Sequence, residues 1–280
     1  MPTLFAILFS LTFSLLPIAV SADPPDVKTL MSHVQEVFEP AGPSIRKVII
    51  SVNIQEKKKA ATAQWIASAT AQWIAGQAFE KTSDGKRILT VILAPEQWKG
   101  YAFLVQEREN ESNVVKAYQA YQPLLGNPAP IDGAAHFLDT DFTIADLGFH
   151  KLPGQPTLQG EETLNGVKAY KVEQKVTPDS GFPYSRVVTW IATDSLFPLQ
   201  REYYDLSGKR WKVVRFEKSP KGEAESLHVS MQDVIGNSST DLTFTQAKEL
   251  ADIPDAVFDD LQMSQAVNSS LWQEYTPKPK

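Results

Sequence analysis

The sequence of 280 residues contains no cysteine. This absence excludes a disulfide framework, a nucleophilic thiol and the lipid-modified cysteine of a bacterial lipoprotein. The sequence also lacks a phosphate-binding P-loop, a dinucleotide glycine fingerprint, a GxSxG elbow and an HExxH motif. We therefore expect no catalytic residue and no cofactor.

Basic charge is scarce as well. Lysine and arginine number 27 against 33 aspartates and glutamates, which gives a net charge of −6. Because binding to a phosphate backbone requires basic patches, nucleic acid is not an expected partner. The same charge gives no attraction to an anionic membrane surface.

Few side chains could ligate a metal or perform acid–base chemistry together. Between residues 136 and 150 the chain carries His136, Asp139, Asp141, Asp146 and His150. These could bind zinc or a hard cation, but aspartates more often cap turns and helix ends, and we expect no metal. Glu161 and Glu162 are adjacent in an expected strand and face opposite sides, which does not suit a glycosidase pair.

No side chain carries a charge within the first 22 residues. Residues 4–20 form one apolar run, and Val20-Ser21-Ala22 is a small-residue site of the kind that signal peptidase cleaves. We expect a signal peptide over residues 1–22, cleaved after Ala22, and an exported protein. A membrane anchor is the alternative, because a run of this length is at the short end of a spanning helix.

Residues 184–217 organise the expected fold. Three stretches rich in β-branched and aromatic residues, 184–192, 199–204 and 210–216, have the composition of strands. Asp194 and Pro198 interrupt the first pair, and residues 205–208 turn the second. Strands joined by such short turns predict an antiparallel meander.

The other expected elements extend this sheet. Apolar residues at helical spacing predict an amphipathic helix over 26–38, which must cover something apolar. Asn165-Gly166 is a hairpin signal. Further strands are expected at 47–55, 87–94, 101–106, 113–121, 157–161, 167–176, 228–235 and 241–244. About 10–11 strands in all predict an α+β, mostly β fold with one strongly curved antiparallel sheet in a single domain over 23–267, followed by a loose tail at 268–280.

The sequence ATAQWIAS at 61–68 is followed at once by ATAQWIAG at 69–76. Eight residues is too short for a solenoid repeat. Because eight is an even number, Trp65 and Trp73 would lie on the same face of a strand. We interpret the duplication as one tolerated in a long edge strand or hairpin.

A sheet of this size can curl around an apolar cavity, the usual form of a site for a hydrophobic ligand. Six tryptophans, eight tyrosines and fourteen phenylalanines supply candidate walls, although most strand aromatics are ordinary core. The candidate cavity-lining residues are Leu30, Met31, Val34, Trp73, Leu104, Phe142, Tyr170, Trp190, Tyr203 and Trp211.

Five stretches resemble, in order, motifs of the outer-membrane lipoprotein-sorting, LolA-like, family of periplasmic proteins. They are LAPEQWKGYAFLVQE (93–107), DTDFTIADL (139–147), GEETLNGVKAYKVE (160–173), YSRVVTWIATDSLFPLQREYYDLSGKRWKV (184–213) and IPDAVFDDLQM (253–263). The resemblance implies an unclosed β-barrel, with the N-terminal helix and short helices covering its concave face.

The resemblance also implies a function. It is that of a monomeric periplasmic carrier, not an enzyme, which binds the acyl chains of a lipoprotein or lipid and moves them between the inner and outer membranes. An inner-membrane permease and an outer-membrane acceptor would be its partners. The alternative is a non-transporting accessory protein of an envelope permease or complex, with the cavity filled by its own side chains. A hydrolase would need an acid–base pair in the cavity, for which the sequence offers no motif.

Overall fold

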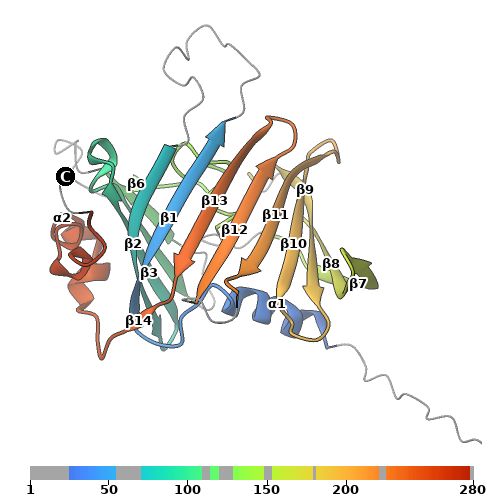
Figure 1. Cartoon of the computed structure of the whole chain (residues 1–280), viewed down its shortest axis with the longest axis horizontal. Coiled ribbons are helices and arrows are strands. Elements are labelled where there is room, and N and C mark those ends of the chain that lie inside the picture. Colours follow the sequence, from blue (N-terminus) through green and yellow to red (C-terminus); the bar gives the residue numbers. More distant parts are fainter. Residues whose placement is uncertain are drawn as a thin grey trace, which may run out of the picture.

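A computed structural model describes residues 25–54, 71–108, 114–119, 129–147, 153–178, 181–220 and 225–277. Its main element is one sheet of 14 strands that curves strongly around a hollow side (Figure 1). The expected signal peptide and residues 61–70 of the duplication lie outside the described residues.

The first half of the sheet is built by the N-terminal part of the chain. Its strands are β1 (Ser44–Ile54), β2 (Ala71–Thr82), β3 (Gly85–Ala94), β4 (Ala102–Arg108), β5 (Val114–Tyr118) and β6 (Ala129–Pro130). The second half consists of β7 (Pro156–Leu164), β8 (Val167–Lys175), β9 (Tyr184–Ala192), β10 (Pro198–Asp205), β11 (Arg210–Lys218), β12 (Ser226–Asp233), β13 (Ser238–Thr245) and β14 (Lys248–Glu249).

The two halves of the sheet meet where β1 pairs with β13. The order across the sheet is β6-β5-β4-β3-β2-β1-β13-β12-β11-β10-β9-β8-β7, and β14 pairs with the start of β1. Pairing is antiparallel throughout this order. The order begins at β6 and ends at β7, so the sheet is open, as the mostly β, unclosed-barrel prediction requires. More strands are found than the 10–11 expected, partly because β6 and β14 have two residues each and give no periodic signal.

Tight turns set the register, as expected from their residues. Asn165 and Gly166 both have positive φ, 51° and 85°, and join β7 to β8 in a two-residue hairpin. In the β10–β11 turn, the Asp205 carboxylate accepts hydrogen bonds from the backbone N–H groups of Ser207 and Lys209, both at 2.9 Å. Gly208 follows with a φ of 82°.

Alternation along the strands shows which face each side chain occupies. In β13, Thr240, Leu242 and Phe244 are buried on the concave side, and the residues between them are half-buried. In β3 and β4 both faces are buried, because a second layer covers the convex side of this part of the sheet.

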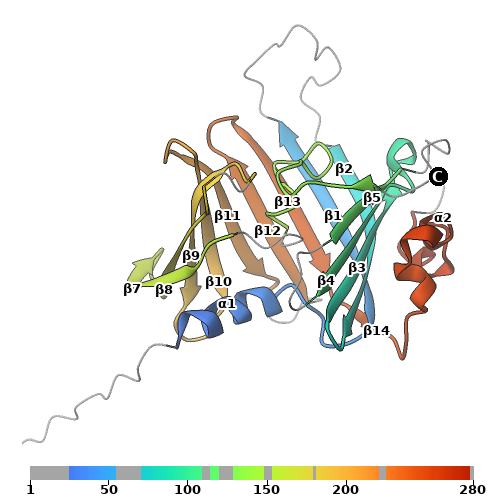
Figure 2. The same ribbon diagram turned by 180° about the vertical axis from the view of Figure 1, so that it is seen from behind.

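The second layer is the C-terminal segment. It consists of the short helices η3 (Asp255–Phe258), η4 (Asp260–Gln262), α2 (Met263–Ala266) and η5 (Ser270–Trp272), beside the convex face of β1–β4 (Figures 1 and 2). Two expectations are corrected here. These short helices pack on the convex face, not the concave one. The tail from 268 is packed through residue 277, because Trp272 is 2 % exposed and its Nε1–H donates to the Ala266 carbonyl at 2.8 Å.

Trp272 lies against a glycine of β2. A Cβ atom on Gly76 would be 2.4 Å from Cε3 of the indole and 2.9 Å from Cζ3. Gly76 is therefore required for space and not for an unusual backbone angle. Its neighbour Trp73 is 4 % exposed and belongs to the main hydrophobic cluster.

The concave side is covered by α1 (Val27–Glu36) and by residues 131–147. Asp26 caps α1 by accepting hydrogen bonds from the N–H groups of Lys28 and Thr29 at 2.9 and 3.1 Å. Leu30 and Val34 of α1 pack against β8 and β9. Figure 2 shows α1 lying across one end of the curved sheet, and residues 131–147 lying over its hollow side.

Candidate functional site

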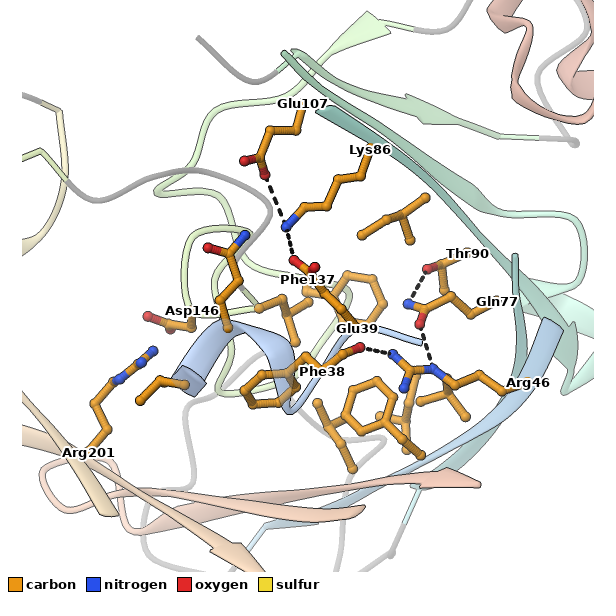
Figure 3. Close-up of a pocket in the computed structure, with 18 of the residues that line it drawn as sticks. Phe38, Glu39, Arg46, Gln77, Lys86, Thr90, Glu107, Phe137, Asp146 and Arg201 are labelled. Atoms are coloured by element: carbon orange, nitrogen blue, oxygen red, sulfur yellow. Dashed lines mark hydrogen bonds and ion pairs between the residues drawn. The ribbon is translucent and has the colours of Figure 1, made fainter. Parts of the chain in front are cut away.

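A cavity of about 250 Å³ lies between α1, the concave face of the sheet and residues 131–147 (Figure 3). Strands β1 to β4 form one wall, and β10 and β13 contribute to the other. The cavity therefore lies where α1 spans the two halves of the sheet.

The apolar part of the cavity is formed by inward side chains of the strands together with side chains of α1, of the residue Phe38 and of residues 131–147. They are Met31, Val34, Phe38, Val48, Ile50, Ile88, Phe137, Leu147, Leu242 and Phe244. Phe38, which follows α1, packs edge-on against Phe216 and Phe244 with ring centroids 5.7 and 6.1 Å apart. The end of α1 is thus held against β11 and β13 by aromatic contacts.

A charged side chain is buried in this apolar wall. The Nε–H of Arg46 donates to Oε1 of Gln77 at 2.8 Å, and Nη2 donates to the backbone carbonyl of Phe38 at 2.9 Å. The guanidinium also lies 4.5 Å from the centroid of the Phe244 ring. Gln77 in turn donates to Oγ1 of Thr90 at 3.1 Å. Burial lowers the pKa of Arg46 to about 10, because desolvation disfavours the charged form.

A second polar group ties the chain after α1 to the sheet. Nζ of Lys86 lies 2.6 Å from Oε1 of Glu39 and 3.1 Å from Oε2 of Glu107. The three side chains are 9–12 % exposed. Glu39 follows α1, whereas Lys86 and Glu107 belong to β3 and β4, so this group and Arg46 anchor the same end of the helix.

The third polar group, which includes Asp146 of the cavity wall, holds residues 131–147 in place. Nζ of Lys212 lies 3.0 Å from Oδ2 of Asp146, and both side chains are at most 1 % exposed. Lys212 also donates to the Asp141 carbonyl at 2.7 Å, and the Tyr184 hydroxyl donates to Asp146 at 2.8 Å. Burial, reinforced by the Asp146 charge, raises the pKa of Tyr184 well above its ordinary value.

Two of the aspartates considered as metal ligands accept hydrogen bonds from neighbouring protein groups. Asp146 accepts from the Thr143 N–H at 2.8 Å, and Asp141 accepts from the hydroxyl of Thr240 at 2.8 Å. His150 is outside the described residues. Within the described ranges, no group of three histidine or acidic side chains could hold a metal ion.

The structure brings some of the sequence-predicted site residues to the cavity. Met31 and Val34 line it, and Leu30 and Tyr170 pack together where α1 meets β8. Four others belong to the main hydrophobic cluster on the concave side or pack against it: Trp73, Phe142, Tyr203 and Trp211.

Two candidates lie on the convex face. Leu104 packs under the C-terminal segment, between Phe103 and Val105, which point the other way. Trp190 packs with Val188, and its indole N–H donates to Glu162. Both sit in strands that are apolar on both faces, so alternation alone did not say which side chains point inward.

Sequence reasoning missed the polar residues of the cavity. Arg46, Gln77 and Lys86 are at inward positions of β1, β2 and β3, in phase with apolar neighbours such as Val48. A polar residue in phase with an inward apolar series is a signal that could have identified them. The arrangement offers an apolar space with fixed charges at one side, which suits an amphiphilic ligand.

Across the described ranges, the helices are too short or too polar to cross a bilayer.

Comparison with known proteins gives one matching family model and several solved structures with the same fold. A family model with the description "-like: Uncharacterized protein" matches residues 84–265. No curated protein matches the sequence.

Solved structures share the fold. An outer membrane lipoprotein-sorting protein domain from Vibrio parahaemolyticus is 18 % identical, with a TM-score of 0.67 over 84 % of this chain and 97 % of that one. A DUF1329 family protein from Desulfovibrio piger is 20 % identical, with a TM-score of 0.64 over 82 % and 95 %. A LolA superfamily protein from Nitrosomonas europaea is 18 % identical, with a TM-score of 0.62 over 83 % and 96 %.

Proposed function

We propose that this chain, which belongs to the family whose model matches residues 84–265 and shares its fold with a lipoprotein-sorting domain and a LolA superfamily protein, is a periplasmic carrier of acyl chains. In this proposal the chains of a lipoprotein or lipid enter the cavity under α1 and are moved between the inner and outer membranes. An inner-membrane permease would load the carrier, and an outer-membrane acceptor would unload it. The observation that carries the proposal is the cavity of about 250 Å³ between α1 and the sheet.

The size of the cavity limits what it holds in this conformation. It exceeds the roughly 150 Å³ of an engineered apolar cavity that binds benzene, and it is just below the about 300 Å³ at which ligand pockets begin. Burying each methylene is worth about 0.8 kcal/mol, so eight methylenes would contribute roughly 6 kcal/mol before ordering costs. A longer chain requires α1 to move away from the sheet.

The contacts of α1 are suited to such a movement. Its buried face consists of Leu30 and Val34, and the following segment is held by the polar contacts of Arg46 and Lys86. A ten-residue helix with two buried side chains is stabilised mainly by its docking. We infer that α1 is the movable cover and that the sheet is the fixed part.

The first experiment asks whether lipid travels with the protein. Purified protein is analysed by native mass spectrometry and organic extraction, and the emptied protein is titrated with a fluorescent fatty acid. We expect bound lipid or saturable uptake. An empty protein without uptake would contradict the proposal and favour the accessory-protein alternative.

A matched pair of variants locates the uptake. Ile88→Trp places a larger side chain in the cavity wall, whereas Ile235→Trp makes the same change at an exposed position after β12. We expect weaker uptake in the first variant and unchanged uptake in the second. Equal uptake by both would show that the ligand binds elsewhere.

The movement of α1 is tested with an introduced cysteine. Because the chain has no other cysteine, Ser32→Cys on the exposed side of α1 can be labelled at a single site with an environment-sensitive dye. We expect its emission to change when a long-chain fatty acid is added.

Secretion is tested separately. The mass of the protein isolated from the periplasm should correspond to cleavage after Ala22.

A further inference from the structure

The charge on Arg46 has no acidic counterpart among the residues that the structure describes. The side chain is 9 % exposed, yet its partners are the Gln77 amide oxygen, the Phe38 carbonyl and the Phe244 ring, all of them neutral. Buried charges are normally paired, because an isolated one has lost its hydration without a counter-charge.

The other buried charges around the cavity do have such partners. Lys86 contacts Glu39 and Glu107, and Lys212 contacts Asp146. Arg46 is therefore an exception in a protein whose overall charge is negative.

A second arginine lines the same cavity from β10. The Nε–H of Arg201 donates to Oγ1 of Thr189 at 3.2 Å, and within the described ranges it makes no ion pair with an acidic side chain. Figure 3 shows Arg201 and Arg46 on different sides of the cavity. Within the described ranges, the cavity wall thus carries two arginines that have no acidic partner, whereas its lysine and its acidic side chains are in ion pairs.

We propose that the cavity selects an amphiphile with an anionic oxygen group, a carboxylate or a phosphate, which Arg46 binds while the apolar chain occupies the space under α1. The proposal rests on the proposed function, since it names the class of ligand that the carrier takes. A guanidinium presents five N–H donors in a fork that matches such anions, and the bonds to Gln77 and Phe38 use two of them. The depressed pKa of Arg46 agrees with a site that an anion would stabilise.

The experiment compares four head groups on one chain length. Decanoate, decyl phosphate, decanol and decyltrimethylammonium are titrated into delipidated protein by isothermal calorimetry, with inorganic phosphate as a fifth arm. Because hydrogen bonds to an ion are the strong ones, we expect at least one of the two anions to bind about tenfold or more tightly than decanol. The ratio between the two anions distinguishes a fatty carboxylate from a lipid phosphate.

The outcomes separate this inference from the proposed function. Decanol or the ammonium compound binding as tightly as both anions would overturn the anionic head group and leave the carrier intact. If no ten-carbon compound binds, the carrier proposal itself fails. If inorganic phosphate binds as tightly as decyl phosphate, the site is an anion site without a role for the chain, and the inference also fails.

Variants assign the anion to Arg46. Arg46→Gln should bring the ratio of anion to decanol affinity close to one, and Arg46→Lys should keep part of it because the charge remains. Arg215→Gln, an exposed position on β11, is the matched control and should keep the full ratio. Retained decanol binding by Arg46→Gln shows that the cavity is still folded. An unchanged ratio in that variant would overturn the assignment.

Discussion

The two copies of the eight-residue duplication differ only in their last residue, which is Ser68 in the first and Gly76 in the second. Residues 71–76 of the second copy form the first half of β2, and Gly76 lies against the ring of Trp272. Deleting either copy tests whether the contact with Trp272 requires a glycine. Removing 61–68 leaves the glycine at this position, and removing 69–76 places a serine there, so the products have equal length and differ at one residue.

The magnitude follows from the distances. A Cβ at position 76 would lie 2.4, 2.9 and 3.2 Å from three atoms of an indole that is 2 % exposed and hydrogen-bonded to Ala266. Overpacking of this kind costs about 1–3 kcal/mol. Expulsion of the ring would cost about 3–5 kcal/mol, the price of removing a buried aromatic. Deletion of 61–68 halves the connection between β1 and β2, which changes the closure free energy by only about 0.6 kcal/mol.

The assay is urea unfolding followed by far-ultraviolet circular dichroism. We expect the 61–68 deletion to match the full chain within about 1 kcal/mol and the 69–76 deletion to be less stable than its counterpart by about 1–3 kcal/mol. In a Trp272→Ala background the difference should disappear, because the ring is absent. Equal stabilities of the two deletions, or a cost that persists without the ring, would refute the reasoning.

Three further predictions concern charges and caps. Lys212→Met should lower the free energy of unfolding by about 3–5 kcal/mol, because it leaves the buried Asp146 charge without its cation. Adding Asp146→Asn to the same chain should recover part of the lost stability, as measured by urea unfolding. Burial raises the pKa of Tyr203 from 10.0 to about 12, so its contribution to stability is complete below pH 10 and is lost as the pH rises through 12. Between pH 10 and 12, the free energy of unfolding of the wild type should therefore fall more steeply than that of Tyr203→Phe. If the two fall in parallel, burial does not raise the pKa of Tyr203. Asp26→Ala removes the three hydrogen bonds that the carboxylate accepts at the start of α1, two of them from backbone N–H groups. Amide exchange within 27–36 should therefore accelerate while exchange in β12 and β13 stays unchanged.

Much of the sheet could be predicted because its signals are local. The Asn165-Gly166 turn fixes one hairpin by its backbone preferences, and the Asp205 to Gly208 turn fixes another. The N-terminal helix was predicted within two residues at each end by its apolar spacing and its flanking prolines and glycine. Each of these features depends on residues within a short window.

The cavity could not be predicted in the same way, because it depends on which face of each strand points inward. Leu104 lies in a strand that is apolar on both sides, so alternation gives no answer there. The C-terminal segment covers the convex side of that strand. This segment is held on the sheet by contacts between residues that are far apart in the sequence, such as Trp272 against Gly76 of β2. The burial of Arg46 likewise arises only when β1, β2 and the end of α1 come together.

The pairing of β1 with β13 has a consequence for how this chain matures. Residues 47 and 245 exchange hydrogen bonds across a separation of 198 positions, so the centre of the sheet is completed only after almost all of the polypeptide has been synthesised. Sheets that depend on such distant pairings form slowly. A nascent chain of this kind remains extended for longer, and a polypeptide that must be threaded through a membrane pore before it folds benefits from that delay.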